Sequence, residues 1–220
     1  MRALVEATDD WLFLHKPAGV PVFPRHDGTP GPCLLHALLD EVPSQDQAFP
    51  EGFAGGIAHR LDVWTSGLVV AARSVAALTR ARALFADGAL AKQYVFLTDR
   101  DVPWDHTEVT HPLAHDRKHK RRMVWQRSPN TPHRGRWFPA RTALRRGSSR
   151  SGGLARWEAT ITTGVTHQIR LHAASAGLAL LGDRLYGGTR RADGRFFLHA
   201  RRIDGWPVRT PELPIPEDWP

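Results

Sequence analysis

Residues 59–72 read HRLDVWTSGLVVAA, a polar segment followed directly by an apolar one. The run from Gly67 to Ala72 is short, continuous and partly β-branched, which favours a strand buried on both faces. Asp62 stands at the mouth of this strand, and the nearby cation Arg60 favours the ionised form of its carboxyl group. This position suits a functional carboxylate, although a surface aspartate that caps a turn is the alternative on these residues alone.

Regular elements are predicted on both sides of this strand. Ser74 is a typical N-cap, apolar residues recur at helical spacing after it, and Gly88 is a typical stop. Alternation of apolar and polar residues predicts a half-buried strand over 156–162, paired as a hairpin with a strand over 138–145. Further strands are expected within 11–23, 90–97 and 196–200, a short helix over 34–40, a helix capped by Thr166 that ends at Gly177, and loops over 43–56, 126–137 and 147–153. The hairpin-like order predicts an α+β fold with a mixed, mostly antiparallel β-sheet.

The composition is that of an ordinary globular protein. The 220 residues include 41% hydrophobic and 24% charged residues, which is enough for one well-buried domain. No apolar run approaches the roughly 18–20 residues needed to span a membrane, and the N-terminus lacks the pattern of a secretory signal. We therefore expect a soluble, cytoplasmic protein. Cys33 is the only cysteine, so an intrachain disulfide is excluded, and a buried small hydrophobe is expected there.

The positive charge is concentrated in one part of the chain. The sequence has 30 Lys and Arg residues against 22 Asp and Glu, and residues 117–157 contain 13 of the cations and no acid. Such a segment attracts phosphate, and most of its cations are arginines, whose planar fork can hold phosphate oxygens in pairs. Contact with nucleic acid is therefore predicted, with a solvated basic face or a disordered segment as the alternative.

Two further segments combine groups that suit a functional site. Lys92 and Tyr94 would point to the same face of a strand, although a lone strand tyrosine more often belongs to a core or a surface. Residues 163–172 read TGVTHQIRLH, which places His167 and Arg170 on one face of the first turn of a helix. The partial positive charge of the helix N-terminus would favour a carboxylate or a phosphate there, and an ordinary surface helix is the alternative.

A histidine series at four-residue intervals comprises His111, His115 and His119. On a helix this spacing would indicate a metal site. Pro112 interrupts a helix near its start, and the surrounding Arg and Lys residues oppose a metal ion electrostatically. We therefore favour a loop that faces RNA over a metal site.

These segments occur in an order that resembles the RluA family of pseudouridine synthases. The main motifs are HRLDxxTSG from His59, KxY from Lys92 and TGxTHQIR from Thr163. Further similar stretches are KPAGV at 16–20, the segment from Pro112-Leu113 to Met123-Val124, GDxLYG at 182–187 and LHA at 198–200. Each motif alone is modest, but their joint order over residues 11–205 is specific.

The resemblance implies a single pseudouridine-synthase-type catalytic domain over residues 1–220, with flanking helices, a central cleft and a basic hairpin or loop region at 117–157. The family isomerises uridine to pseudouridine within structured RNA and needs no cofactor and no metal. Asp62 would be the essential carboxylate, either attacking the sugar or the base, or removing a sugar proton to give a glycal. Arg170 would pair with Asp62, and Tyr94 would stack near the base and remove the proton of carbon 5.

The resemblance also implies contacts with the substrate. Arg60 would fill the space that a flipped uridine leaves in its stack. The full set of expected substrate-binding residues is His59, Arg60, Thr65, His167, Gln168 and Leu198. Val165 stands where the family usually has a basic residue, and Val63 and Trp64 stand where a charged pair is frequent. These departures leave the choice of target RNA open.

Several points stay open at this level. Ribosomal and transfer RNA are both plausible targets, a monomer is expected, and the small N-terminal RNA-binding domain of many relatives is expected to be absent. A noncatalytic RNA-binding protein on the same fold is the first alternative function. A histidine-based metallohydrolase, which would contain stoichiometric metal, is the second.

Overall fold

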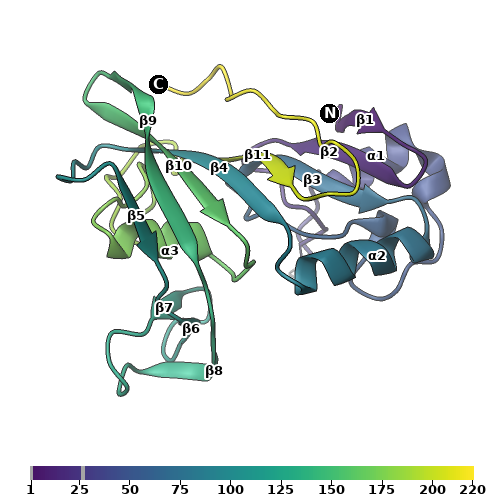
Figure 1. The fold of residues 1–220 in the computed structure, drawn as a ribbon. Coiled ribbons are helices and arrows are strands. Elements are labelled where there is room, and N and C mark those ends of the chain that lie inside the picture. Colours follow the sequence, from purple (N-terminus) through teal and green to yellow (C-terminus); the bar gives the residue numbers. More distant parts are fainter. Residues whose placement is uncertain (1, 26–27) are drawn as a thin grey trace. The chain divides into compact units, whose positions relative to one another are not determined.

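The computed structural model describes residues 2–25 and 28–220, and these residues form two compact units. Unit 1 comprises Met1–Leu90 and His199–Pro220, and unit 2 comprises Ala91–Leu198. The elements of both units are labelled in Figure 1. Each unit is built around its own β-strands.

The strands of unit 1 follow the order β1-β2-β3-β11. They are β1 (Leu4–Ala7), β2 (Trp11–Lys16), β3 (Ser66–Ala72) and β11 (Leu198–Asp204). β2 is antiparallel to both β1 and β3, whereas β11 runs parallel to β3. Every residue of β3 is buried, which confirms the strand predicted from its continuous apolar run.

Two α-helices and two short 3₁₀ turns accompany this sheet. They are α1 (Leu34–Glu41), η1 (Pro43–Gln45), η2 (Ala54–Gly56) and α2 (Val75–Ala86). The Ser74 side chain accepts a hydrogen bond from the Ala77 amide at 3.1 Å, so the predicted N-cap of α2 is confirmed. Apolar residues of α2 pack against side chains of β2 and β3 in one cluster, along one face of the sheet (Figure 1).

The main sheet of unit 2 has the order β4-β10-β9-β5. Its strands are β4 (Ala91–Thr98), β5 (His106–Val109), β9 (Thr142–Ser151) and β10 (Leu154–Ile161), and all are antiparallel to their neighbours. Alternate residues of β10 are buried, among them the predicted set Trp157, Ala159 and Ile161. The expected hairpin between β9 and β10 is confirmed.

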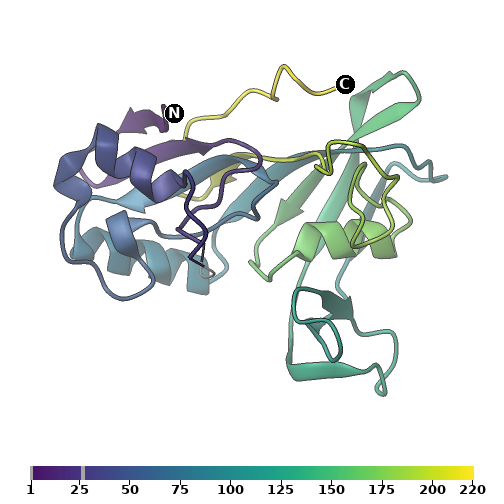
Figure 2. The same cartoon turned by 180° about the vertical axis from the view of Figure 1, so that it is seen from behind.

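A smaller antiparallel sheet in unit 2 has the order β7-β6-β8. It consists of β6 (Leu113–Asp116), β7 (Met123–Trp125) and β8 (His133–Phe138), and it lies at one end of unit 2 in both views, near α3 (Gln168–Ser175) (Figures 1 and 2). We call residues 111–138, which form this sheet and its connections, the arm. A cluster that includes Leu113, Met123 and Leu171 packs the arm against α3.

Three local predictions were wrong. The segment 126–137 was expected to be a loop, but β8 begins within it because its backbone pairs with β6. The expected loop over 147–153 is shorter, since β9 continues to Ser151 by pairing with β10 and only Gly152 and Gly153 form the turn. The strand expected over 138–145 begins later, at Thr142, and Phe138 is instead the last residue of β8.

The α+β class with a mixed, mostly antiparallel sheet is confirmed. The single catalytic domain over 1–220 and the central cleft stay predictions. Within the described residues, no helix has the length and apolar character needed to cross a membrane.

Candidate active site

Asp62 lies in a β-turn that leads directly into β3. The Thr65 amide donates to the Asp62 carbonyl at 3.1 Å, which closes the turn. The segment before the turn is fixed to the same strand, because the Val70 amide donates to Nε2 of His59 at 3.1 Å. The sequence therefore places Asp62 on a tightly held turn at the start of a buried strand. Its side chain is half-buried.

Lys16 is a buried cation that supports this turn. Its Nζ donates to the backbone carbonyls of Pro17, Val20 and Val63 at 2.8, 2.7 and 3.0 Å. The three acceptors match the three N–H donors of an ammonium group. Burial lowers the pKa of Lys16 to about 7, while the negative charge of Asp62 acts in the opposite direction. Lys16 thus ties the KPAGV segment to the turn that carries Asp62.

Two further predicted residues adjoin this turn, and Leu198 stands at the boundary of the two units, where β11 begins. Thr65 is buried and Arg60 is exposed. Leu198 is buried at the start of β11, and the next residue, His199, lies opposite Ser66 of β3. Nδ1 of His199 and Oγ of Ser66 are hydrogen-bonded at 2.9 Å. Burial lowers the pKa of His199 to about 4, so its ring is neutral near pH 7.

Tyr94 is buried on β4 of unit 2, opposite Ala159 of β10. Lys92 lies two residues earlier on the same strand, and burial lowers its pKa to about 8. A Cβ atom added at Gly164 would lie 3.0 Å from Nζ of Lys92, so the glycine of the TGVT segment allows the lysine to approach. The two sequence motifs KxY and TGxTHQIR therefore meet within this unit.

Arg170 forms a buried, bidentate ion pair with Asp183. Nε donates to Oδ2 at 2.7 Å and Nη2 donates to Oδ1 at 2.9 Å. The guanidinium carbon also lies 4.3 Å from the ring centre of Phe196 and 5.2 Å from that of Tyr186. These contacts fix the plane of the guanidinium group. A guanidinium has five N–H donors, of which Asp183 takes two, so the expected pairing with Asp62 would use others.

His167 precedes α3 in a left-handed conformation, with φ of 57°. It is the only non-glycine residue with positive φ among residues 2–25 and 28–220, and such strain is typical of functional sites. Its Nδ1 is hydrogen-bonded to the Tyr186 hydroxyl at 2.8 Å, and that hydroxyl also accepts from the Met123 amide. The N-cap of α3 is thus His167, and the prediction of Thr166 as the cap was wrong.

Gln168 makes four hydrogen bonds with the protein. Its Oε1 accepts from the Thr163 hydroxyl and the Val165 amide, and its Nε2 donates to the Arg141 carbonyl and the Thr142 hydroxyl. These bonds use the full capacity of the side-chain amide. Gln168 therefore holds the start of α3 in place, and its expected contact with a substrate stays a prediction.

The arm carries most of the exposed positive charge of the 117–157 segment. Its exposed cations are Arg117, Lys118, Lys120, Arg121, Arg127, Arg134 and Arg136. Acids from elsewhere in the chain pair with the later arginines, as in Arg141–Glu108, Arg145–Glu158, Arg146–Asp101 and Arg146–Asp105. Acidic side chains thus neutralise part of the positive charge of residues 117–157. Most of the positive charge that is not neutralised lies on the arm.

The histidine series lies on the arm, and the rings of His111 and His115 contact aromatic neighbours. His111 stacks on Trp125 with ring centres 4.7 Å apart, and His115 packs edge-on against Phe138. In the part of the chain that the structure describes, no group of three or more His, Cys, Asp or Glu side chains is arranged to hold a metal ion.

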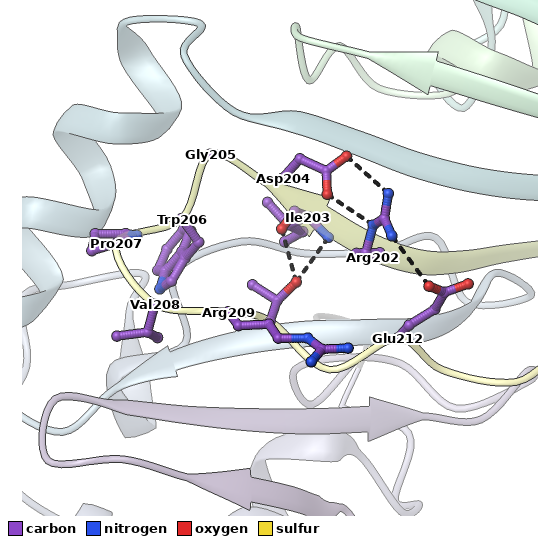
Figure 3. A pocket seen from close by; sticks show the side chains of 10 residues that line it. Arg202, Ile203, Asp204, Gly205, Trp206, Pro207, Val208, Arg209 and Glu212 are labelled. Atoms are coloured by element: carbon purple, nitrogen blue, oxygen red, sulfur yellow. Dashed lines mark hydrogen bonds and ion pairs between the residues drawn. The ribbon is translucent and has the colours of Figure 1, made fainter.

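A surface hollow of about 290 Å³ is lined by residues 202–210 and Glu212. Three of its charged side chains are paired with one another, since Arg202 contacts Asp204 at 2.8 Å and Glu212 at 3.2 Å (Figure 3). The Thr210 hydroxyl donates to the Ile203 carbonyl. None of the predicted site residues lines this hollow, so it is not the candidate site.

Two groups of predicted residues are therefore each assembled within one unit. His59, Arg60, Asp62 and Thr65 lie around the turn in unit 1, and His167, Gln168 and Arg170 lie at the start of α3 in unit 2. Asp62 lies in unit 1, whereas Tyr94 and Arg170 lie in unit 2. Their assembly into one catalytic site stays a prediction. Sequence reasoning did not assign roles to Lys16 and Asp183, although both lie in motifs that it noted.

Comparison with known proteins decides the family. The family model described as RNA pseudouridylate synthase matches residues 10–175, which is most of the chain. The chain belongs to this family. The RluA-type resemblance of the motifs is thereby confirmed.

Several bacterial members of the pseudouridine synthase family are similar over nearly the whole chain. The uncharacterized RNA pseudouridine synthase YhcT of Bacillus subtilis is 30% identical, over 94% of this chain and 64% of its own length. The ribosomal large subunit pseudouridine synthase D of Xylella fastidiosa is 34% identical, over 96% and 65%. This chain spans less than two thirds of the length of these curated relatives.

A solved structure has the same fold. Human RNA Pseudouridylate Synthase Domain Containing 1 superposes with a TM-score of 0.72 over 96% of this chain and 82% of the human chain, at 23% sequence identity. At this identity the likeness concerns the fold alone.

Proposed function

We propose that this chain is an RNA pseudouridine synthase that isomerises uridines in structured RNA. The observation that carries the proposal is the turn at Asp62, which presents a half-buried carboxylate at the end of the HRLD motif in a chain of this family. Ribosomal RNA is the favoured substrate class, because curated relatives are named ribosomal large subunit pseudouridine synthases. Transfer RNA, a cytoplasmic location and a monomeric state stay predictions.

The reaction breaks the N-glycosidic bond of uridine, turns the uracil and joins its carbon 5 to the ribose. Asp62 acts as the essential carboxylate, either as a nucleophile or as the base that gives a glycal. Tyr94 removes the carbon 5 proton at the end. Arg170, whose guanidinium plane is fixed by Asp183 and two aromatic rings, pairs with the carboxylate and orients it.

The substrate must be held while the target base leaves its stack. Unstacking costs a few kcal/mol and least in loops and bulges, so single-stranded or irregular RNA is the favoured substrate. The exposed cations of the arm support binding of the phosphate backbone. Arg60, which is exposed beside Asp62, is suited to fill the vacated space in the stack.

The alternative is an RNA-binding protein that no longer catalyses the reaction. The presence of Asp62, Tyr94 and Arg170 together argues against it, because a protein that only binds RNA needs none of the three as a set. Both functions predict RNA binding, and only an enzyme changes the RNA.

The experiment uses the purified 220-residue chain with ribosomal and transfer RNA labelled with tritium at carbon 5 of uridine. Isomerisation releases the label to water, and we expect release to scale with enzyme concentration. Mapping of pseudouridines in total RNA, with and without the gene, then identifies the target. RNA binding without tritium release from ribosomal or transfer RNA would support the noncatalytic alternative.

A further inference from the structure

An exposed tryptophan lies two residues after Asp62. Within the described part of the chain, the large hydrophobic residues with exposed side chains are Val5, Val63, Trp64, Val75 and Val208. Trp64 is the only aromatic residue among them, and it is 37% exposed, as is its neighbour Val63. Two of the five therefore adjoin the candidate catalytic carboxylate.

The chemistry of turns does not favour this apolar pair. Val63 and Trp64 are the central residues of the turn closed by the bond between Thr65 and Asp62. Such positions are usually taken by Gly, Pro, Asn, Asp or Ser, because these residues suit turn geometry and solvent. A β-branched residue and an indole at a solvent-facing turn contribute little to a core. A ligand explains their presence better than folding does.

The Trp64 ring is held in place from one side. A Cβ atom added at Gly19 would lie 3.0 Å from a ring carbon of Trp64, so the indole rests against the backbone of the KPAGV segment. This segment and the turn are joined by hydrogen bonds to the Val63 carbonyl from the Gly19 amide at 2.8 Å and from Lys16 Nζ at 3.0 Å. The indole is therefore supported on a rigid base before any ligand arrives.

We propose that Trp64 is a stacking residue for the unpaired nucleobase next to the target uridine. This inference rests on the proposed function and adds to it a residue that binds the RNA beside the target. An indole offers the area of one base, whereas a protein partner would need a far larger interface than two side chains provide.

The test compares wild type, Trp64→Ala, Trp64→Phe and the control Val208→Ala, which removes an exposed valine outside this turn. The substrates are stem-loop RNAs with a single uridine in the loop and with adenine or an abasic residue at its 5′ or 3′ neighbour. Kinetics of tritium release give kcat and KM for each pair, and thermal melting confirms that each variant is folded.

Stacking of a base on an aromatic side chain corresponds to about a 5- to 150-fold gain in affinity. We expect Trp64→Ala to raise KM about tenfold on the adenine substrate, with kcat little changed, and Trp64→Phe to restore most of the loss. The wild type should lose a similar factor when one neighbour becomes abasic, and Trp64→Ala should be insensitive to that change. Val208→Ala should behave as wild type.

Equal KM values for wild type and Trp64→Ala, or an equal loss on adenine and abasic substrates, would overturn the stacking role. Absence of tritium release by the wild type would instead defeat the proposed function. Fluorescence anisotropy with the same RNAs would then decide stacking separately, since Trp64→Ala must still weaken binding only where the neighbouring base is present.

Discussion

Replacing Asp183 by Asn removes the countercharge of a buried arginine. The side chains of Arg170 and Asp183 are 8% and 1% exposed and are joined by two hydrogen bonds. Removing one partner of a buried ion pair costs about 3–5 kcal/mol, because the other charge stays buried without compensation. Asn still offers one acceptor oxygen, so we expect the free energy of unfolding to fall by about 3 kcal/mol. Urea unfolding followed by circular dichroism measures this change.

A surface pair of the same type supplies the control. Arg191 and Asp193 are 3.1 Å apart, with side chains 37% and 40% exposed. Exposed pairs contribute little, so Asp193→Asn should leave the urea midpoint unchanged. A loss of stability in Asp183→Asn no larger than that of Asp193→Asn would refute the structural role given to the Arg170–Asp183 pair.

Two further predictions concern the contact between β3 and β11. Burial is the main cause, and the nearby charge of His15 the second, that lowers the pKa of His199 from 6.5 to about 4. Between pH 4 and pH 6.5 the unfolded chain therefore binds a proton at this residue that the folded chain does not bind. Stability should therefore fall by about 3 kcal/mol as the pH drops from 6.5 to 4, and urea unfolding of His199→Asn should show a weaker dependence. Gly67 has φ of +124° and an added Cβ would lie 2.2 Å from the Ala200 carbonyl oxygen, so Gly67→Ala should cost about 3 kcal/mol or more. Gly31→Ala, where nothing lies within 4 Å, is its control, and a similar melting temperature for both would contradict the assigned contact.

Elements with strong local signals were predictable from the sequence. The continuous apolar run of β3 and the alternation of β10 report burial directly, and Ser74 marks the start of α2 by its own hydrogen bond. The strand β8, with the sequence HRGRWF, shows no alternation of apolar and polar residues. It is a strand because β6 supplies its hydrogen-bond partners, and a single segment contains no information about a partner of that kind.

The candidate site was also only partly predictable from the sequence. Motif order drew attention to Asp62, Tyr94 and Arg170, but the pairing of Arg170 with Asp183 depends on how the chain folds after α3. Charge counting along the sequence also overstated the basic surface, because Glu108 of β5 pairs with Arg141. Trp64 was noted only as a departure from the family pattern, and its exposure gives that departure a physical meaning.

The most direct measurement compares tritium release by wild type and Asp62→Asn on the same labelled RNA, together with their RNA affinities. Asn has nearly the shape of Asp but neither its charge nor its basicity, so it tests the carboxylate and little else. We expect no release above background from Asp62→Asn, with RNA affinity within about twofold of wild type. Release by Asp62→Asn at a rate within about tenfold of wild type would contradict the role of Asp62 as the essential carboxylate.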